Sequence, residues 1–497
     1  MLSEYRKRFS DYHSQLNLEE YLFRTGSKSQ NDKSHISGEN TDLLSRQSID
    51  GLRTAFEETA EFLETERNGI RKLLAFAYEG ARVLSAREIT GEIEDYESAA
   101  TVQWEDRRVG VRELEELIYK EDKLERRREL YTRQIDLIDE VQDLRAERQR
   151  VMAESVKVLG FDNYRAMKKD LQGVDISDPA RYARLILDQT EKAYVAKFPG
   201  FLAGITGLSL DDALPADLEY LKGMTKFDSH LPADRILGVL DETCRGLGFR
   251  INNQSNFSLD ATQRRGKQRR SFYSTIRVPQ DIRASISLIG GQANYRQVLS
   301  IMGQSQQFAW TSANLKPENR FAACGMDCST PAGWGFLFQN LLGDRQWLES
   351  CFGVIDSQQL RHALGIFRLL ELRRQAALTI YEAEFYAGGA GVNPAIHYSE
   401  LMTDALKIDA GESGHLIDLS DSCDAANFIR AAGFEAQFRD HLKTRYGSRW
   451  WDSARAGEEI IDIWNTGLRY DVGELSSKLG LGAINFDYLV EDVLNGL

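Results

Sequence analysis

The chain has 497 residues, and its 62 Lys and Arg against 76 Asp and Glu give a formal net charge of −14 at pH 7. General binders of nucleic acid or of anionic membranes need positive surface, so this charge disfavours both classes of partner. Hydrophobic residues make up 42% of the chain, which permits a large buried core. No stretch approaches the roughly 18–20 apolar residues of a membrane span, and no signal-peptide pattern opens the chain. The five cysteines do not suggest a disulfide framework, so we expect a cytoplasmic protein.

Long helices are expected in the first half, because only 8 prolines interrupt the whole chain. Residues 27–40 are polar and rich in Ser, which predicts a loop. From about residue 113 to 159, apolar residues recur at three- and four-residue steps, which predicts one long helix. The charged residues 123–129 are interpreted as the solvated side of that helix.

Three further helices have marked starts or ends. Ser177-Asp178-Pro179 places a capping side chain before a proline at the first helical position. Pro232 leads into a predicted helix over 236–244, and another helix runs from about 360 to 386, where Gly388-Gly389 ends it. We find no internal repeat and no linker, so the pattern favours one mostly helical body.

Periodicity changes between about residues 257 and 290. The segments 271–278 and 283–289 alternate in polarity and are rich in aromatic and β-branched residues. They predict two or three short antiparallel strands. The edge of such a hairpin can pair with an extended peptide backbone.

A basic run, Arg264 to Arg270, comes just before these strands and is followed by Phe272 and Tyr273. Basic residues beside aromatic rings are typical of surfaces that bind nucleic acid. One such hairpin on a chain with a charge of −14 is weak evidence, and we expect no nucleic acid partner.

Motifs for other chemistries are missing from the sequence. There is no phosphate-binding loop, no dinucleotide-binding fingerprint and no serine-hydrolase elbow. None of the seven histidines begins an H-E-x-x-H motif. Cys324 and Cys328 are four residues apart, but without a second ligand pair they predict buried thiols and not a zinc site. A redox role for these two thiols is left open.

The segment from Gly290 to Leu348 carries a more specific pattern. It contains Gly290-Gly291, a short polar spacer, Tyr295 and, farther on, Ala332-Gly333-Trp334-Gly335-Phe336-Leu337-Phe338. This resembles the active-site region of the M3-type zinc oligopeptidases, such as thimet oligopeptidase and oligoendopeptidase F, and more distantly angiotensin-converting enzyme. In that family a Gly-Gly pair and a Tyr precede a helix with H-E-x-x-H, and a second helix carries E-G-W-x-F-L-F.

The resemblance covers residues 220–475 well and implies a fold. We expect a mainly α, two-lobed body with a deep central cleft and a small antiparallel sheet at its rim. Its mostly helical N-terminal lobe would span 1–250 and its catalytic-like lobe 251–497, interwoven as one peptidase-like domain. The hairpin would lie at about 257–290 and the former zinc-helix region at about 290–345.

At the positions that carry the family's chemistry, this sequence differs. The two histidines fall on Ser300 and Gln304, the general-base glutamate on Ile301 and the third-ligand glutamate on Ala332; the oxyanion-stabilising tyrosine falls on Phe428. A hydroxyl and an amide are poor ligands for Zn²⁺, and Ile301 cannot take a proton from water. Zinc lowers the pKa of bound water from about 15.7 to about 7, and nothing in the pattern replaces that activation. We therefore expect no zinc, no other cofactor and no catalytic residue.

The retained framework predicts a binding protein. The residues expected to bind a ligand in the cleft are Phe272, Tyr273, Gly290, Gly291, Tyr295, Trp334 and His415, the last lying near the family's oxyanion histidine. We expect an inactive peptidase homologue that binds a peptide or small ligand in its cleft, with an active paralogue or another protein as a further partner. Two alternatives stay open: a protein-interaction scaffold without a cleft ligand, and a hydrolase with an altered site.

Overall fold

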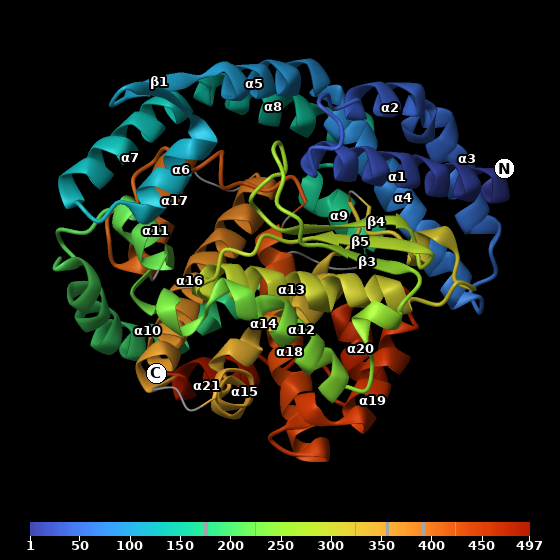
Figure 1. Ribbon diagram of the computed structural model, residues 1–497. Coiled ribbons are helices and arrows are strands. Elements are labelled where there is room, and N and C mark those ends of the chain that lie inside the picture. The colour runs from blue at the N-terminus through green and yellow to red at the C-terminus, as the bar shows by residue number, and fades with distance from the viewer. Residues whose placement is uncertain (173–176, 224, 324, 354–356, 389–392, 423) are drawn as a thin grey trace. The chain divides into compact units, whose positions relative to one another are not determined.

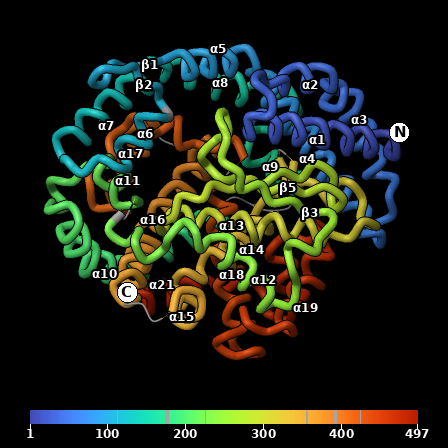
Figure 2. The backbone as a smooth tube through the Cα atoms, in the orientation of Figure 1, coloured from blue at the N-terminus to red at the C-terminus, as the bar shows by residue number. Residues whose placement is uncertain are grey.

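The computed structural model describes residues 1–172, 177–223, 225–323, 325–353, 357–388, 393–422 and 424–497 (Figure 1; Figure 2). Its backbone falls into two compact units. Unit 1 comprises Met1–Gly80, Phe227–Arg361 and Arg430–Leu489, and unit 2 comprises Ala81–Lys226, His362–Ile429 and Val490–Leu497. Each unit therefore takes residues from both sides of position 250.

Helices dominate the structure, which confirms the mainly α fold class. The helices are α1 (Leu2–Arg24), α2 (Lys33–Glu39), α3 (Arg46–Glu58), α4 (Glu64–Ser85), α5 (Arg87–Ala99), α6 (Val111–Lys120), α7 (Leu124–Asp139), α8 (Gln142–Val158), α9 (Tyr164–Gln172), α10 (Ser177–Thr206), α11 (Pro215–Gly223), α12 (Ile236–Gly246), α13 (Gly291–Trp310), α14 (Ser329–Gln339), α15 (Arg345–Phe352), α16 (Ser357–Tyr386), α17 (Pro394–Leu406), α18 (Asp424–Tyr446), α19 (Ala454–Trp464), α20 (Val472–Lys478) and α21 (Asp487–Asn495). Short 3-10 helices are η1 (Thr41–Leu44), η2 (Thr225–His230), η3 (Ala233–Arg235), η4 (Ile251–Asn253), η5 (Pro317–Asn319), η6 (Asn340–Gly343) and η7 (Trp450–Asp452). Within the described ranges, none of these helices combines the length and the apolar character of a membrane span.

Unit 1 contains a sheet of three strands, β3 (Phe257–Asp260), β4 (Phe272–Arg277) and β5 (Asp281–Ser285), in the order β3-β5-β4. The predicted hairpin is present, because β4 and β5 pair antiparallel. The expectation of a wholly antiparallel sheet was wrong, since β3 runs parallel to β5. Residues 261–271 carry the chain from β3 across β5 to the far edge of the sheet, and this crossover produces the parallel pair. Alternation in sequence fixes which face a side chain takes, but it does not fix strand direction.

Helix α1 covers the outer edge of β4 in unit 1 (Figure 1). The Asn17 amide donates to the Thr275 carbonyl at 2.8 Å, and the Ser274 hydroxyl donates to the Asn17 carbonyl at 2.8 Å. Tyr21 packs on Phe272 and Ile276 from the same side. The first helix therefore satisfies polar groups that an edge strand would otherwise leave open.

A second hairpin in unit 2 escaped the sequence analysis. Strands β1 (Thr101–Trp104) and β2 (Arg107–Gly110) pair antiparallel around a turn in which Glu105 has a φ of 52°. Trp104 and Val109 are buried with residues of α6, α7 and α11. The two strands are only four residues long and the turn lacks glycine, so the usual hairpin signal is absent.

The predicted helix over 113–159 is helical but broken into α6, α7 and α8. The interpretation of residues 123–129 as a solvated face was wrong at Arg127, whose side chain is 1% exposed. Its guanidinium bonds to the Asp217 carboxylate at 2.9 and 2.7 Å, which turns this part of α7 toward α11. A charged run shows polarity, but it does not show that one member has a buried partner far along the chain.

The other helix predictions compare well with the structure. Helices α12 and α16 match the expected segments, and α10 begins at Ser177. The predicted loop over 27–40 was wrong in part, because α2 occupies Lys33–Glu39. Gly388 has a φ of +77° at the end of α16, while Gly389 lies outside the described residues.

An aromatic group encloses His13 in the core of unit 1. The His13 ring lies 4.5 Å from Phe9, 5.3 Å from Phe76 and 5.8 Å from Phe321 between centroids. Its Nε2 has no hydrogen-bond partner among the described residues. Burial lowers the pKa of His13 from 6.5 to about 4, because the charged imidazolium loses its hydration in the core.

His13 is therefore expected to destabilise the protein in acid. Between about pH 6.5 and 4 the unfolded chain binds a proton that the folded chain does not, so stability falls as the pH falls through this window. The loss attributable to His13 should total about 3 kcal/mol. Urea titrations at several pH values check this against His13→Asn, which removes the titrating group. Equal slopes of stability against pH for both proteins would contradict the prediction.

Candidate functional site

The segment that resembles the zinc-binding region forms two closely packed helices of unit 1, α13 and α14 (Figure 1). Two glycines lie where the helices meet. A Cβ atom built on Gly303 would lie 2.2 Å from the Trp334 carbonyl oxygen. A Cβ atom built on Gly335 would lie 2.6 Å from both the Ser300 Oγ and the Gln304 Nε2. The two helices can approach this closely only because neither glycine has a side chain.

Gly303→Ala is expected to destabilise the protein by about 2–3 kcal/mol, because the new methyl group would collide with backbone that cannot rotate away. Gly343→Ala is a suitable control, since a Cβ there meets no described atom within 4 Å and should change stability by less than about 0.5 kcal/mol. Denaturant titrations of both variants measure the difference. Equal stability of the two variants would contradict the close approach of α13 and α14 at Gly303.

Ser300 and Gln304 lie one turn apart on α13 and face α14. The Gln304 amide nitrogen donates to the Ser300 hydroxyl at 2.9 Å. Among the described hydrogen bonds, this is the only one that either side chain makes. Ile301 is 6% exposed, and Ala332 on α14 is half-buried. The site therefore offers a hydroxyl and an amide, with an alkyl group at each position where the family that the sequence resembles carries a carboxylate.

These side chains do not fit the zinc ion that the resemblance implies. Zinc prefers imidazole, thiolate and carboxylate ligands, whereas the Ser300 and Gln304 side chains are neutral. One N–H of the Gln304 amide is already hydrogen-bonded to the Ser300 hydroxyl. Among the residues that the structure describes, no three His, Cys, Asp or Glu side chains gather in a way that could hold a metal ion. His397 pairs instead with Glu384, and His441 with Glu459 at 2.8 Å.

The N-terminus of α13 is fixed by the Gly-Gly pair that precedes it. Gly290 and Gly291 have φ values of +84° and +78°, a region that favours glycine. A Cβ atom on Gly290 would lie 3.0 Å from the Leu231 carbonyl oxygen, and one on Gly291 would lie 2.3 Å from the Asp228 carboxylate. The Asn294 side chain accepts from the amides of residues 289 and 290 at 3.1 Å each. The sequence analysis gave Asp228 and Asn294 no role at this helix start, because Asn294 is not at the N-cap position and Asp228 belongs to the distant η2.

Three of the residues expected to bind a ligand are buried in unit 1. Tyr295 is 1% exposed and its hydroxyl donates to the Pro232 carbonyl at 2.7 Å. Phe272 is 6% exposed, with the Arg24 guanidinium 3.9 Å from its ring centroid. Trp334 is 1% exposed. In this structure the three rings pack in the interior, and a ligand-binding role for them stays a prediction.

Tyr273 is half-buried and lies against α13, where its ring stacks on Phe308 at 5.9 Å. Burial raises the pKa of Tyr273, and the nearby Cys328 thiol adds to the effect. Cys328 is half-buried, with its Sγ 3.7 Å from the Met326 carbonyl oxygen. Cys328 is therefore a reduced thiol, as expected, but it is only half-buried; Cys324 lies outside the described residues.

The start of α14 is held by a half-buried ionic group. Asp327 accepts a hydrogen bond from the Ser329 amide at 2.7 Å and pairs with Arg430, which also contacts Asp471 at 3.2 Å. Burial alone would raise the pKa of Asp327, but Arg430 and the Ser329 hydrogen bonds hold it below its usual range. These contacts position Ala332 and Gly335 opposite α13.

The remaining two predicted residues belong to unit 2. Phe428 lies in α18 and is half-buried. His415 is half-buried, and its Nδ1 lies 2.9 Å from the Glu412 carbonyl oxygen. Unit 1 thus brings Ser300 and Gln304 together against α14, the helix that carries Ala332, whereas Phe428 and His415 belong to unit 2.

Comparison with known proteins reveals the fold but no relative in sequence. No protein-family model and no curated protein matches the chain. An M32 carboxypeptidase from Deinococcus radiodurans R1 superposes with a TM-score of 0.65 at 13% identity, over 100% of this chain and 99% of its own. A protein described as an oligoendopeptidase F gives a TM-score of 0.72 at 15% identity, over 98% and 89%. A carboxypeptidase from Pyrococcus furiosus gives 0.62 at 12% identity, over 100% and 98%.

The chain has the fold of these peptidases. The match covers 99% of the Deinococcus and 98% of the Pyrococcus carboxypeptidase chain. The expectation of an M3-like fold is confirmed, and α13 and α14 are the helices on which it placed the catalytic positions.

Proposed function

We propose that this protein is a catalytically inactive homologue of the M3- and M32-type peptidases that binds peptides in the cleft expected of that fold. The observation that carries the proposal is the Gln304–Ser300 hydrogen bond, which joins the two side chains at the positions of the zinc-binding histidines. Ile301 and Ala332 occupy the positions of the two glutamates, and neither can act as a base or a ligand.

The rate acceleration that zinc and a general base would provide is large, and the side chains at these positions do not replace it. A zinc-bound water is about nine pKa units more acidic than bulk water, and a general base contributes a further factor of about 10²–10⁴ in rate. Among the described residues the Ser300 hydroxyl is hydrogen-bonded only to the Gln304 amide, which is not a base, and Ile301 beside it in the sequence carries no titratable group. Hydrolysis by the mechanism of the family is therefore not expected.

Peptide binding needs only hydrogen-bond donors and acceptors, and the side chains at this site provide both. The Ser300 hydroxyl keeps a hydrogen to donate, and the Gln304 amide keeps an acceptor oxygen and a second N–H. These are the donor and acceptor types that pair with a peptide backbone. The retained peptidase fold supplies the framework, and Tyr273 adds a half-buried aromatic surface on the strand beside α13.

Thermal unfolding in the presence of a diverse library of peptides tests the proposal. A bound peptide should raise the melting temperature in a concentration-dependent way, and the peptides should be recovered uncleaved. Ser300→Ala combined with Gln304→Leu should reduce the shift, whereas Gln359→Leu, at an exposed position of α16, should leave it unchanged. No shift with any peptide would overturn peptide binding and favour an interaction scaffold. Cleaved peptides would favour a hydrolase with an altered site.

A further inference from the structure

The loop between β3 and β4, residues 261–271 of unit 1, concentrates positive charge on a chain of net charge −14. Five of its side chains are basic within seven positions: Arg264, Arg265, Lys267, Arg269 and Arg270. Arg264 and Lys267 anchor the loop to the rest of unit 1, and the four arginines are exposed to solvent.

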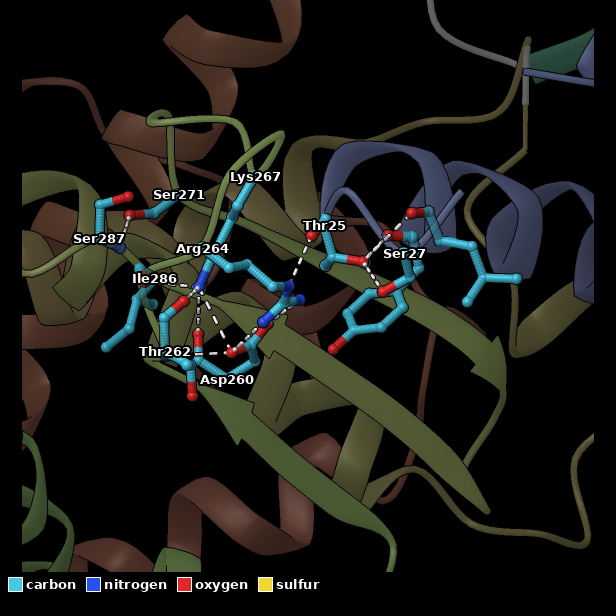
Figure 3. A network of polar contacts seen from close by, with 11 residues as sticks. Thr25, Ser27, Asp260, Thr262, Arg264, Lys267, Ser271, Ile286 and Ser287 are labelled. Atoms are coloured by element: carbon cyan, nitrogen blue, oxygen red, sulfur yellow. Dashed lines mark hydrogen bonds and ion pairs between the residues drawn. The ribbon is translucent and has the colours of Figure 1, made fainter. Parts of the chain in front are cut away.

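Lys267 and Arg264 anchor the loop (Figure 3). The Lys267 ammonium donates to the carbonyls of Asp260, Thr262 and Ile286 at 2.8, 3.1 and 3.1 Å, and its side chain is 6% exposed. The Arg264 guanidinium pairs with both oxygens of the Asp260 carboxylate at 3.1 and 2.7 Å. Their charges are therefore used within the fold.

Helix α1 fixes the loop from the other side. The Arg264 Nε donates to the Thr25 carbonyl at 2.7 Å (Figure 3). The Gln268 amide donates to the Arg24 carbonyl at 2.9 Å. A Cβ atom built on Gly26 would lie 2.7 Å from the Gly266 carbonyl carbon, so the two backbones touch. Few conformations of the loop satisfy all these contacts.

The anchored part of the loop forms a tight turn, and the arginines in and after this turn are exposed. The Lys267 amide donates to the Arg264 carbonyl at 3.2 Å, and Gly266 has a φ of +83°, as a type II turn requires at its third position. Arg265 stands at the second position, and its side chain is exposed. Arg269 and Arg270 follow, also exposed, just before β4. A pre-ordered backbone lowers the entropy lost when such side chains bind a partner.

We propose that Arg265 and Arg270 form a docking surface for an acidic, Asp- and Glu-rich segment of a partner protein. Guanidinium groups bind carboxylates in a bidentate geometry, and a cationic surface on an acidic protein selects for partners of opposite charge. The surface uses none of the side chains to which peptide binding is assigned, so the inference does not depend on the proposed function.

Single-stranded nucleic acid fits the surface less well, although the basic run is followed by two aromatic residues. Base recognition of that kind needs exposed rings on which bases stack. Phe272 is 6% exposed beneath Arg24, and the Tyr273 ring is stacked on Phe308. The aromatic platform that the sequence suggested is therefore occupied within the fold.

Fluorescence anisotropy with the full chain tests the proposal. The probe is a labelled ten-residue peptide of alternating Glu and Ser, compared with alternating Gln and Ser and with an oligothymidylate of equal charge. We expect the acidic peptide to bind best, with an affinity that falls as salt rises from 50 to 200 mM.

Two double variants with equal loss of charge give the decisive comparison. Arg265→Ser with Arg270→Ser should weaken binding of the acidic peptide by about three- to tenfold. Arg46→Ser with Arg108→Ser, at exposed positions of α3 and β2, should leave it unchanged. Equal weakening by both double variants, or no binding of the acidic peptide, would overturn the proposal. Preference for the oligothymidylate would reassign the surface to nucleic acid.

Discussion

Trp334→Ala is expected to lower the free energy of unfolding by about 3–5 kcal/mol, the cost of removing a large aromatic side chain from a packed core. The Trp334 ring lies 5.7 Å from Phe434, 5.4 Å from Phe438 and 5.9 Å from Trp464 between centroids, with near-perpendicular ring planes in each pair. All four residues belong to unit 1. Truncation would leave a cavity that three rigid rings cannot fill. Denaturant titration, or a fall in melting temperature, measures the loss.

Trp334→Phe separates packing from hydrogen bonding. Among the described residues the indole N–H of Trp334 has no partner, so phenylalanine removes area without leaving an acceptor unpaired. We expect a loss well below that of Trp334→Ala. If Trp334→Ala changed peptide affinity while leaving stability intact, the ring would face a ligand and its placement in the core would be contradicted.

Asp217→Ala is expected to destabilise the protein by about 3–5 kcal/mol, because it leaves the Arg127 charge buried in unit 2 without its carboxylate partner. The side chains of Arg127 and Asp217 are 1% and 0% exposed. Asp217 also accepts from the Leu214 amide at 3.0 Å, so its removal leaves that donor open as well. A buried ion loses its hydration on folding and recovers it only through such partners. Chemical denaturation of the variant measures the effect.

The matched control is an ion pair of the same helix at the surface. Arg133 and Glu129 lie 2.6 Å apart but are 37% and 52% exposed, so Glu129→Ala should cost less than about 1 kcal/mol. Replacing the buried pair together, Arg127→Met with Asp217→Leu, should restore most of the stability that Asp217→Ala loses. A similar small cost for Asp217→Ala and Glu129→Ala would contradict the burial of this pair.

Local patterns in the sequence predicted the helices and strands better than they predicted which distant residues those elements contact. The alternation that predicted β4 and β5 is a property of neighbouring residues, and both strands are present. The parallel direction of β3 depends on where residues 261–271 cross the sheet, which no local pattern specifies. Likewise Arg127 is read as solvated from its neighbours, but its burial is decided by Asp217, 90 positions away.

At the candidate site, too, the sequence predicted the helices but not the contacts between them. The resemblance identified α13 and α14 and the altered positions on them, and the i, i+4 spacing of Ser300 and Gln304 allows their hydrogen bond. That spacing does not reveal the close approach of the two helices at Gly303 and Gly335. It also does not separate an aromatic ring that binds a ligand from one that packs in a core. Trp334 is enclosed by residues from about 100 to 130 positions downstream, and only the fold brings them together.

The central claim, that the zinc site has been lost with its ligands, is tested most directly by metal content. The chain is purified without chelator, re-equilibrated with zinc and measured by inductively coupled plasma mass spectrometry. A variant that restores the family's residues, Ser300→His, Ile301→Glu, Gln304→His and Ala332→Glu, is measured beside it. We expect less than about 0.1 zinc ion per natural chain and close to one per restored chain. Close to one tightly held ion on the natural chain would contradict the claim.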